Sequence, residues 1–113
     1  MGLYLFKSNP SVLEEQESFS YEDYRSLQSI LEQHHFKEID PQRFRNPNNE
    51  FVGLPAHRRT VQIVPALTSY LSEYLQALKP NYFYLDCESM HPSSVYPIST
   101  LEYYLCTLSS DKL

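Results

Sequence analysis

Asn81-Tyr82-Phe83-Tyr84-Leu85-Asp86-Cys87 is the stretch of this chain that indicates its fold most directly. The run is rich in aromatic residues, which favour β-strands, and it is bounded by Pro80 on one side and by polar residues on the other. Residues two apart in a strand share a face. One face therefore carries Phe83, Leu85 and Cys87, and the other carries Tyr82, Tyr84 and Asp86. Both faces are apolar enough for a central strand of a sheet.

A helix is predicted on each side of this strand. Apolar residues recur at three- and four-residue steps from Ala66 to Leu78, and Lys79-Pro80 supplies a cation and a stop at the C-terminal end. After a connection from Pro92 to Pro97, the pattern Ser99-x-x-Glu102 resembles a capping box and predicts a short final helix up to Leu108.

The N-terminal half predicts a similar alternation of elements. Residues 2–7 form an apolar run that predicts a strand, and Ser20-x-x-Asp23 predicts the capped start of a helix that continues to about His35. Alternating patterns predict strands at residues 36–39 and 59–64, with an optional brief strand at 50–54. Residues 41–49, with two prolines and three asparagines, are expected to be an exposed loop.

These elements indicate an α+β fold in a single small domain over residues 1–113. We expect a mostly antiparallel sheet of about four strands with two to three helices packed on it. The order of elements resembles that of ferredoxin-like folds, and this resemblance implies no function because such folds host many unrelated activities. A chain of 113 residues is long enough for one hydrophobic core.

Composition narrows the class of protein. No apolar run approaches the roughly 20 residues that a membrane-spanning helix needs, so we expect a soluble, cytoplasmic protein without membrane association. Cys87 and Cys106 are far apart and form no zinc-finger spacing, so neither a disulfide framework nor a cofactor is expected. The net charge is −5, which disfavours general binding to nucleic acid.

Positive charge is concentrated in residues 41–60. This segment holds Arg43, Arg45, Arg58 and Arg59 against Glu50 alone. Arginine binds phosphate or carboxylate through two parallel hydrogen bonds, and Phe44 is placed to stack on a base. The predicted binding residues here are Arg43, Phe44, Arg45, His57, Arg58 and Arg59. The alternative is that the arginines pair with the acidic first helix and the loop before it, or are simply solvated.

The end of the aromatic strand offers a candidate metal site. Asp86 and Glu88 lie two residues apart, and His91 follows, so two carboxylates and an imidazole can converge on Mg²⁺, Mn²⁺ or Zn²⁺. The Asp-x-Glu pattern resembles the first acidic motif of the DEDD exonucleases over three residues. That family needs further acidic motifs downstream, and only Glu102 and Asp111 follow here. The alternative is a solvated strand end.

Three functional hypotheses follow. The first is a small cytosolic protein-interaction module, such as an inhibitor, an antitoxin-like protein or an accessory subunit, with a protein partner or a second copy of itself. Met90 and Tyr96, in and beside the loop at 89–97, are its expected interface anchors. The second is a metal-dependent hydrolase or nuclease that uses Asp86, Glu88 and His91. The third is RNA binding through Tyr82, Tyr84 and the arginine segment.

Overall fold

Strand β1 (Gly2–Phe6) is an interior strand, between β5 and β6, of an antiparallel sheet of seven strands in the order β2-β3-β4-β5-β1-β6-β7. The computed structural model describes residues 2–65, 70–86 and 95–104. The other strands are β2 (Lys37–Asp40), β3 (Arg43–Arg45), β4 (Phe51–Gly53), β5 (Thr60–Val64), β6 (Tyr82–Asp86) and β7 (Val95–Pro97). Helices α1 (Tyr21–Gln33) and α2 (Leu71–Leu78) and the 3₁₀ turn η1 (Ile98–Thr100), continued as helix by residues 101–104, complete the described chain.

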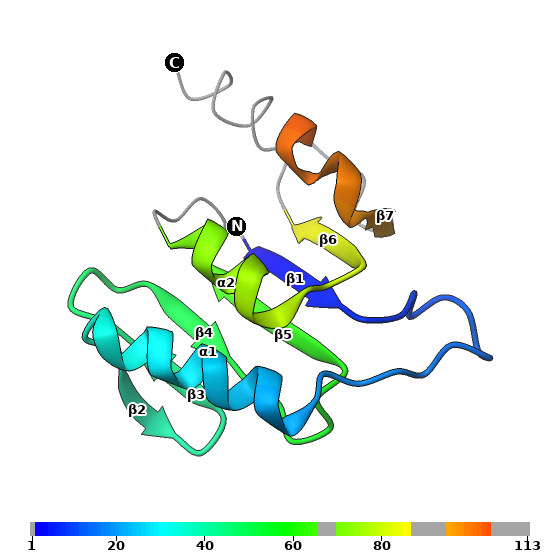
Figure 1. The fold of residues 1–113 in the computed structure, drawn as a ribbon. Helices are drawn as coiled ribbons and strands as arrows, with labels where there is room; N and C mark the ends of the chain where they lie inside the picture. Colours follow the sequence, from blue (N-terminus) through cyan, green and yellow to red (C-terminus); the bar gives the residue numbers. More distant parts are fainter. Residues whose placement is uncertain (1, 66–69, 87–94, 105–113) are drawn as a thin grey trace.

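Helices α1 and α2 lie side by side on the same face of the sheet (Figure 1). Strand alternation directs apolar side chains towards them. Leu5 of β1 is paired with Val61 on one side and Phe83 on the other, and all three are fully buried. Side chains of this size each contribute about 1.5 to 3 kcal/mol when they leave water, so this face anchors the fold.

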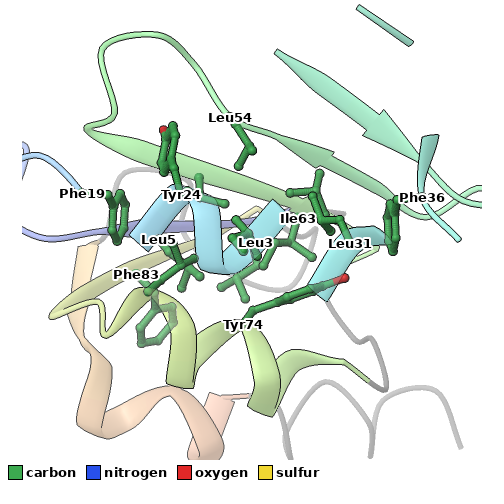
Figure 2. Packing of buried hydrophobic residues seen from close by; sticks show 14 of the residues in the cluster. Leu3, Leu5, Phe19, Tyr24, Leu31, Phe36, Leu54, Ile63, Tyr74 and Phe83 are labelled. Carbon is green, nitrogen blue, oxygen red and sulfur yellow. The ribbon is translucent and has the colours of Figure 1, made fainter. Parts of the chain in front are cut away.

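Helix α1 begins where the sequence predicts it. The Ser20 hydroxyl accepts a hydrogen bond from the Asp23 amide at 3.0 Å, and the Asp23 carboxylate accepts one from the Ser20 amide at 3.0 Å. This reciprocal pair satisfies two donors that a helix start otherwise leaves without partners. The helix buries its apolar stripe, Tyr24, Leu27 and Leu31, against the sheet (Figure 2).

Contacts at the end of α1 join the two helices. The His34 ring stacks on Tyr70 with 3.7 Å between ring centres, and its Nε2 atom is hydrogen-bonded to the Glu73 carboxylate of α2. Tyr74 of α2 is 1% exposed, and its ring meets the Tyr70 ring edge-on with 6.5 Å between ring centres. Figure 2 shows Tyr74 among the buried side chains. Helix α2 ends at Leu78, followed by Lys79 in a left-handed conformation, whose carbonyl accepts a hydrogen bond from the Lys7 ammonium.

The structure confirms the α+β class and corrects three predictions. The sheet has seven strands instead of about four. Residues 41–49, predicted to be an exposed loop, contain β3, because a two-residue turn and hydrogen bonds from the Asn48 and Glu50 amides to the Asn46 side chain fold the segment into hairpins. Ser99 caps no helix because it lies inside η1, which begins one residue earlier. Residues 66–69 and 105–108 of the predicted helices lie outside the described residues.

Among the residues that the structure describes, no helix has the length and apolar character needed to cross a bilayer.

Candidate binding face of the sheet

The face of the sheet that points away from α1 and α2 carries a continuous set of polar, charged and aromatic side chains. We call it the open face, because among residues 2–65, 70–86 and 95–104 both helices pack on the opposite side (Figure 1). Cross-strand pairing places one row of side chains across it. In order, this row contains Arg43, Gly53, Gln62, Tyr4, Tyr84 and Val95. A neighbouring row contains Lys37, Arg45, Phe51 and Val64.

Two arginines share one aromatic ring on this face. The guanidinium carbon of Arg43 lies 5.3 Å from the centre of the Phe51 ring, and that of Arg45 lies 5.6 Å from it. Arg45 and Phe51 are directly paired across β3 and β4, and Arg43, two residues before Arg45, projects from the same face. Attraction between each cation and the ring is worth about 0.5 to 1 kcal/mol at exposed positions. The ring therefore holds both guanidinium groups close to the sheet. We call this group of three residues the arginine clamp.

The arginine clamp is only partly neutralised by acidic side chains. Asp40 accepts a hydrogen bond from Arg43 Nε at 2.6 Å, and its other oxygen accepts one from the Gln42 amide at 3.0 Å. The Arg43 hydrogen bond, followed by the Gln42 amide, lowers the pKa of Asp40. The Arg43 side chain nevertheless stays 54% exposed, and Arg45 forms no ion pair with any residue described in the structure. Positive charge therefore remains available on this face.

Asn46 sets the register that brings the arginine clamp together. It is 5% exposed, and its side-chain oxygen accepts hydrogen bonds from the amides of Asn48 and Glu50 at 3.0 and 2.9 Å. Its amide nitrogen donates to the Glu50 carboxylate at 2.9 Å. A buried asparagine with its hydrogen-bonding groups satisfied fixes a turn firmly. Strands β3 and β4 leave this turn with Arg45 opposite Phe51.

Aromatic side chains occupy the other half of the open face. The rings of Tyr4 and Tyr84 lie 5.5 Å apart at an angle of 49°, and Gln62 Nε2 donates a hydrogen bond to the Tyr4 hydroxyl at 3.1 Å. Tyr82 lies on the same face, opposite Phe6. Between the tyrosines and the arginine clamp, Gly53 contributes no side chain. The face therefore has a charged end and an aromatic end, with buried Gly53 and the Gln62 side chain between them.

The second basic cluster does not join the first. Arg58 has a left-handed backbone, its carbonyl accepts a hydrogen bond from the Phe19 amide, and its charge acts on Tyr24 of α1. Burial raises the pKa of Tyr24 to about 12, with Arg58 opposing the shift. His57 Nδ1 accepts a hydrogen bond from the Arg59 amide at 2.9 Å. Both His57 and Arg59 line a cleft of about 240 Å³ where β1 ends and β5 begins, and Glu15 of the loop before α1 lines it too.

The predicted internal pairing of the arginines with the acidic first helix is not observed. Among the described ion pairs, the arginine segment contributes only the contact between Arg43 and Asp40. Phe44, predicted to stack on a base, is half-buried and packs against the core on the helix side. Phe51, which the sequence analysis did not single out, takes the position beside the arginines. The alternating pattern of residues 43–45 is the signal that separates Phe44 from its neighbours.

The proposed metal ligands are placed only in part. Asp86 is the last residue of β6, is exposed and lies opposite Gly2. Glu88, His91 and the predicted anchor Met90 lie outside the described residues, so the metal site stays a prediction. Among the residues that are described, no group of three or more His, Cys, Asp or Glu side chains is arranged to hold a metal ion.

Tyr96, the remaining predicted anchor, belongs to the helix side of the sheet. Its ring lies 5.8 Å from that of buried Phe83 and 4.6 Å from that of Tyr104, and the residue is half-buried.

Comparisons of the chain with protein-family models, with curated proteins and with solved structures found no match.

Proposed function

We propose that this protein is a small cytoplasmic protein-interaction module, such as an inhibitor or an accessory subunit, and that it binds its partner through the open face. The observation that supports this proposal best is the arginine clamp, in which Arg43 and Arg45 are held over Phe51 on the side of the sheet away from the helices. Aromatic residues and arginine are enriched at protein interfaces and provide most of their strongest contacts.

The charge distribution supports a partner with an acidic surface. The whole chain has a net charge of −5, but the open face presents Lys37, Arg43 and Arg45 at one end. A local positive patch on an acidic protein attracts a negative surface and repels copies of the protein that approach in the wrong orientation. We therefore expect specific association, with an association rate that falls as salt increases.

A capture experiment with matched variants tests the proposal. Immobilised wild-type protein, the double variant Arg43→Gln with Arg45→Gln, and the control Arg25→Gln are exposed to the same native lysate. Arg25 lies on α1, is exposed and is held beside Tyr21, so it controls for the loss of a surface arginine. We expect a partner retained by the wild type and by the control and lost by the double variant. Identical retention by all three folded proteins would contradict the proposal.

RNA binding is a second candidate, and one observation favours it. Tyr4 of β1 and Tyr82 and Tyr84 of β6 lie on the open face of two adjacent strands. Aromatic residues that stack on RNA bases project from the face of a sheet in this way. The ferredoxin-like order proposed from the sequence is supported by β1, which lies between β5 and β6, with β2, β3 and β7 extending the sheet. If the double variant left the affinity for single-stranded RNA and its salt dependence unchanged, this candidate would fail.

A further inference from the structure

We propose that the arginine clamp binds an extended acidic peptide segment of a partner protein, with carboxylates at alternate positions received by Arg43 and Arg45. This inference rests on the proposed function and specifies the chemistry of the partner. The observations that carry it are the spacing of the two arginines, their restraint by Phe51, the absence of a side chain at Gly53 and the competing carboxylate of Asp40.

Spacing selects alternate positions. Arg43 and Arg45 are two residues apart on β3, so their side chains leave the same face of the strand about 7 Å apart along its length. An extended peptide repeats its side chains over the same distance on each face. Two carboxylates separated by one residue therefore match the spacing at which the two arginine side chains leave β3. Adjacent carboxylates in an extended peptide point to opposite faces, so only one can reach the pair.

The arginines are also held before binding. Each guanidinium group lies over the Phe51 ring, and β3 is hydrogen-bonded to β2 on one side and β4 on the other. Restraint of a long side chain in the free protein lowers the conformational entropy that binding must remove. Guanidinium groups bind carboxylates in a planar, two-bond geometry, which adds directional specificity.

Gly53 places no side chain beside Arg43, and the residue itself is buried. It lies directly opposite Arg43 on β4, and a Cβ atom built there meets its nearest neighbour, Gln62 Cβ, at 3.7 Å, an ordinary contact. Its backbone has no positive φ angle, so neither conformation nor crowding requires glycine at this position. Glycine inside a strand often marks a place where another backbone approaches closely. A peptide backbone bound on the open face beside Arg43 gives Gly53 such a role.

Asp40 acts as an internal competitor. Its carboxylate occupies Arg43 Nε at 2.6 Å, which is the kind of contact that a peptide carboxylate would make. Incoming acidic side chains must share Arg43 with Asp40 or displace it, while Arg45 is not paired with any described acid. Removal of the Asp40 charge should therefore strengthen binding, whereas removal of either arginine should weaken it.

Fluorescence anisotropy with two labelled synthetic peptides tests this inference. Both peptides contain the same glutamates and valines. In one the glutamates alternate with valine, and in the other they are adjacent. We expect the wild type to bind the alternating peptide more tightly, Arg43→Gln and Arg45→Gln to weaken binding about threefold to tenfold, and Asp40→Asn to strengthen it roughly twofold to threefold. Arg25→Gln should leave the affinity unchanged, and thermal unfolding checks that each variant is folded.

Several outcomes would overturn the inference. Equal affinity for the two peptides would show that the spacing of the carboxylates does not affect binding. Equal weakening of binding by Arg25→Gln would show that only the net charge of the protein matters. If neither peptide bound while partner capture still depended on Arg43 and Arg45, the peptide chemistry would be wrong and the proposed function would stand. Binding of a single-stranded RNA control without binding of either peptide would show that the open face binds RNA and not an acidic peptide.

Discussion

Arg45 and Phe51 lie directly opposite each other across β3 and β4, with the guanidinium carbon 5.6 Å from the ring centre, although five residues separate them in the chain. The turn between them is organised by the buried side chain of Asn46. A polar residue in a tight turn thus determines how a charged and an aromatic side chain meet on the open face.

Substitution of Asn46 should disturb both stability and the arginine clamp. In Asn46→Ala, the amides of Asn48 and Glu50 lose their acceptor, which should lower the free energy of unfolding by about 1 to 3 kcal/mol. Urea denaturation measures this change. Asn48→Ala, at an exposed position of the same turn, serves as the control and should stay within about 0.5 kcal/mol of the wild type. Equal losses in both variants would contradict the role given to Asn46.

Gly53→Ala should separate stability from binding. Alanine fits at ordinary contact distance and restricts the unfolded chain, so the free energy of unfolding should rise by about 0.4 to 1 kcal/mol. The added methyl group occupies space beside Arg43 where the peptide backbone is proposed to lie, so affinity for the alternating acidic peptide should fall. Thermal unfolding and anisotropy measure the two effects on one protein. A variant that is more stable and binds as well as the wild type would show that Gly53 has no part in binding.

Asp40 should make stability depend on pH in the acidic range. The pKa of Asp40 is lowered in the folded protein by the Arg43 hydrogen bond, so the folded state binds fewer protons than the unfolded state near the ordinary pKa. The stability that this group contributes is therefore present above its unfolded pKa and is lost as pH falls through the folded pKa. Urea midpoints of wild type and Asp40→Asn should differ at neutral pH and converge in acid. A constant difference across the range would contradict this assignment.

Tyr24 should contribute the opposite dependence in alkaline solution. Burial raises its pKa from 10.0 to about 12, so between these values the folded state holds a proton that the unfolded state has released. Stability from this group is complete below pH 10 and falls as pH rises towards 12. Tyr24→Phe should show a smaller loss of stability over this interval, measured by urea denaturation. Tyr21→Phe, at an exposed position of the same helix, should behave like the wild type.

The sequence predicts the parts of the fold that depend on local patterns. The capping box of Ser20 and Asp23 starts α1 as expected, because its hydrogen bonds join residues three apart. Alternation in the aromatic strand correctly separates Phe83 and Leu85, which are buried, from Tyr82 and Tyr84 on the open face. Both signals lie within one short stretch of chain, and the tertiary structure only has to preserve them.

The arginine clamp was missed where it depends on register. Alternation over residues 43–45 separates Phe44 from the two arginines, but it does not show which residue of the next strand lies beside them. Phe51 meets Arg45 only because Asn46 closes the turn between β3 and β4. The prediction from the sequence therefore included Arg43 and Arg45 but gave Phe44, instead of Phe51, as their aromatic neighbour. The turn-forming stretch Asn46-Pro47-Asn48-Asn49, between the alternating triplet 43–45 and the apolar triplet 51–53, was the available sign of a hairpin.

Amide chemical-shift mapping with the alternating acidic peptide tests the central claim most directly. The account predicts that, as the peptide is added, the largest shifts occur at Arg43, Arg45, Phe51 and Gly53, with smaller ones at Gln62 and Tyr4 along the same row of the open face. The amide chemical shifts of α1 and α2, on the opposite side of the sheet, should not change. Shifts concentrated on the helices, or none on β3 and β4 when anisotropy reports saturation, would contradict the assignment of the open face as the binding surface.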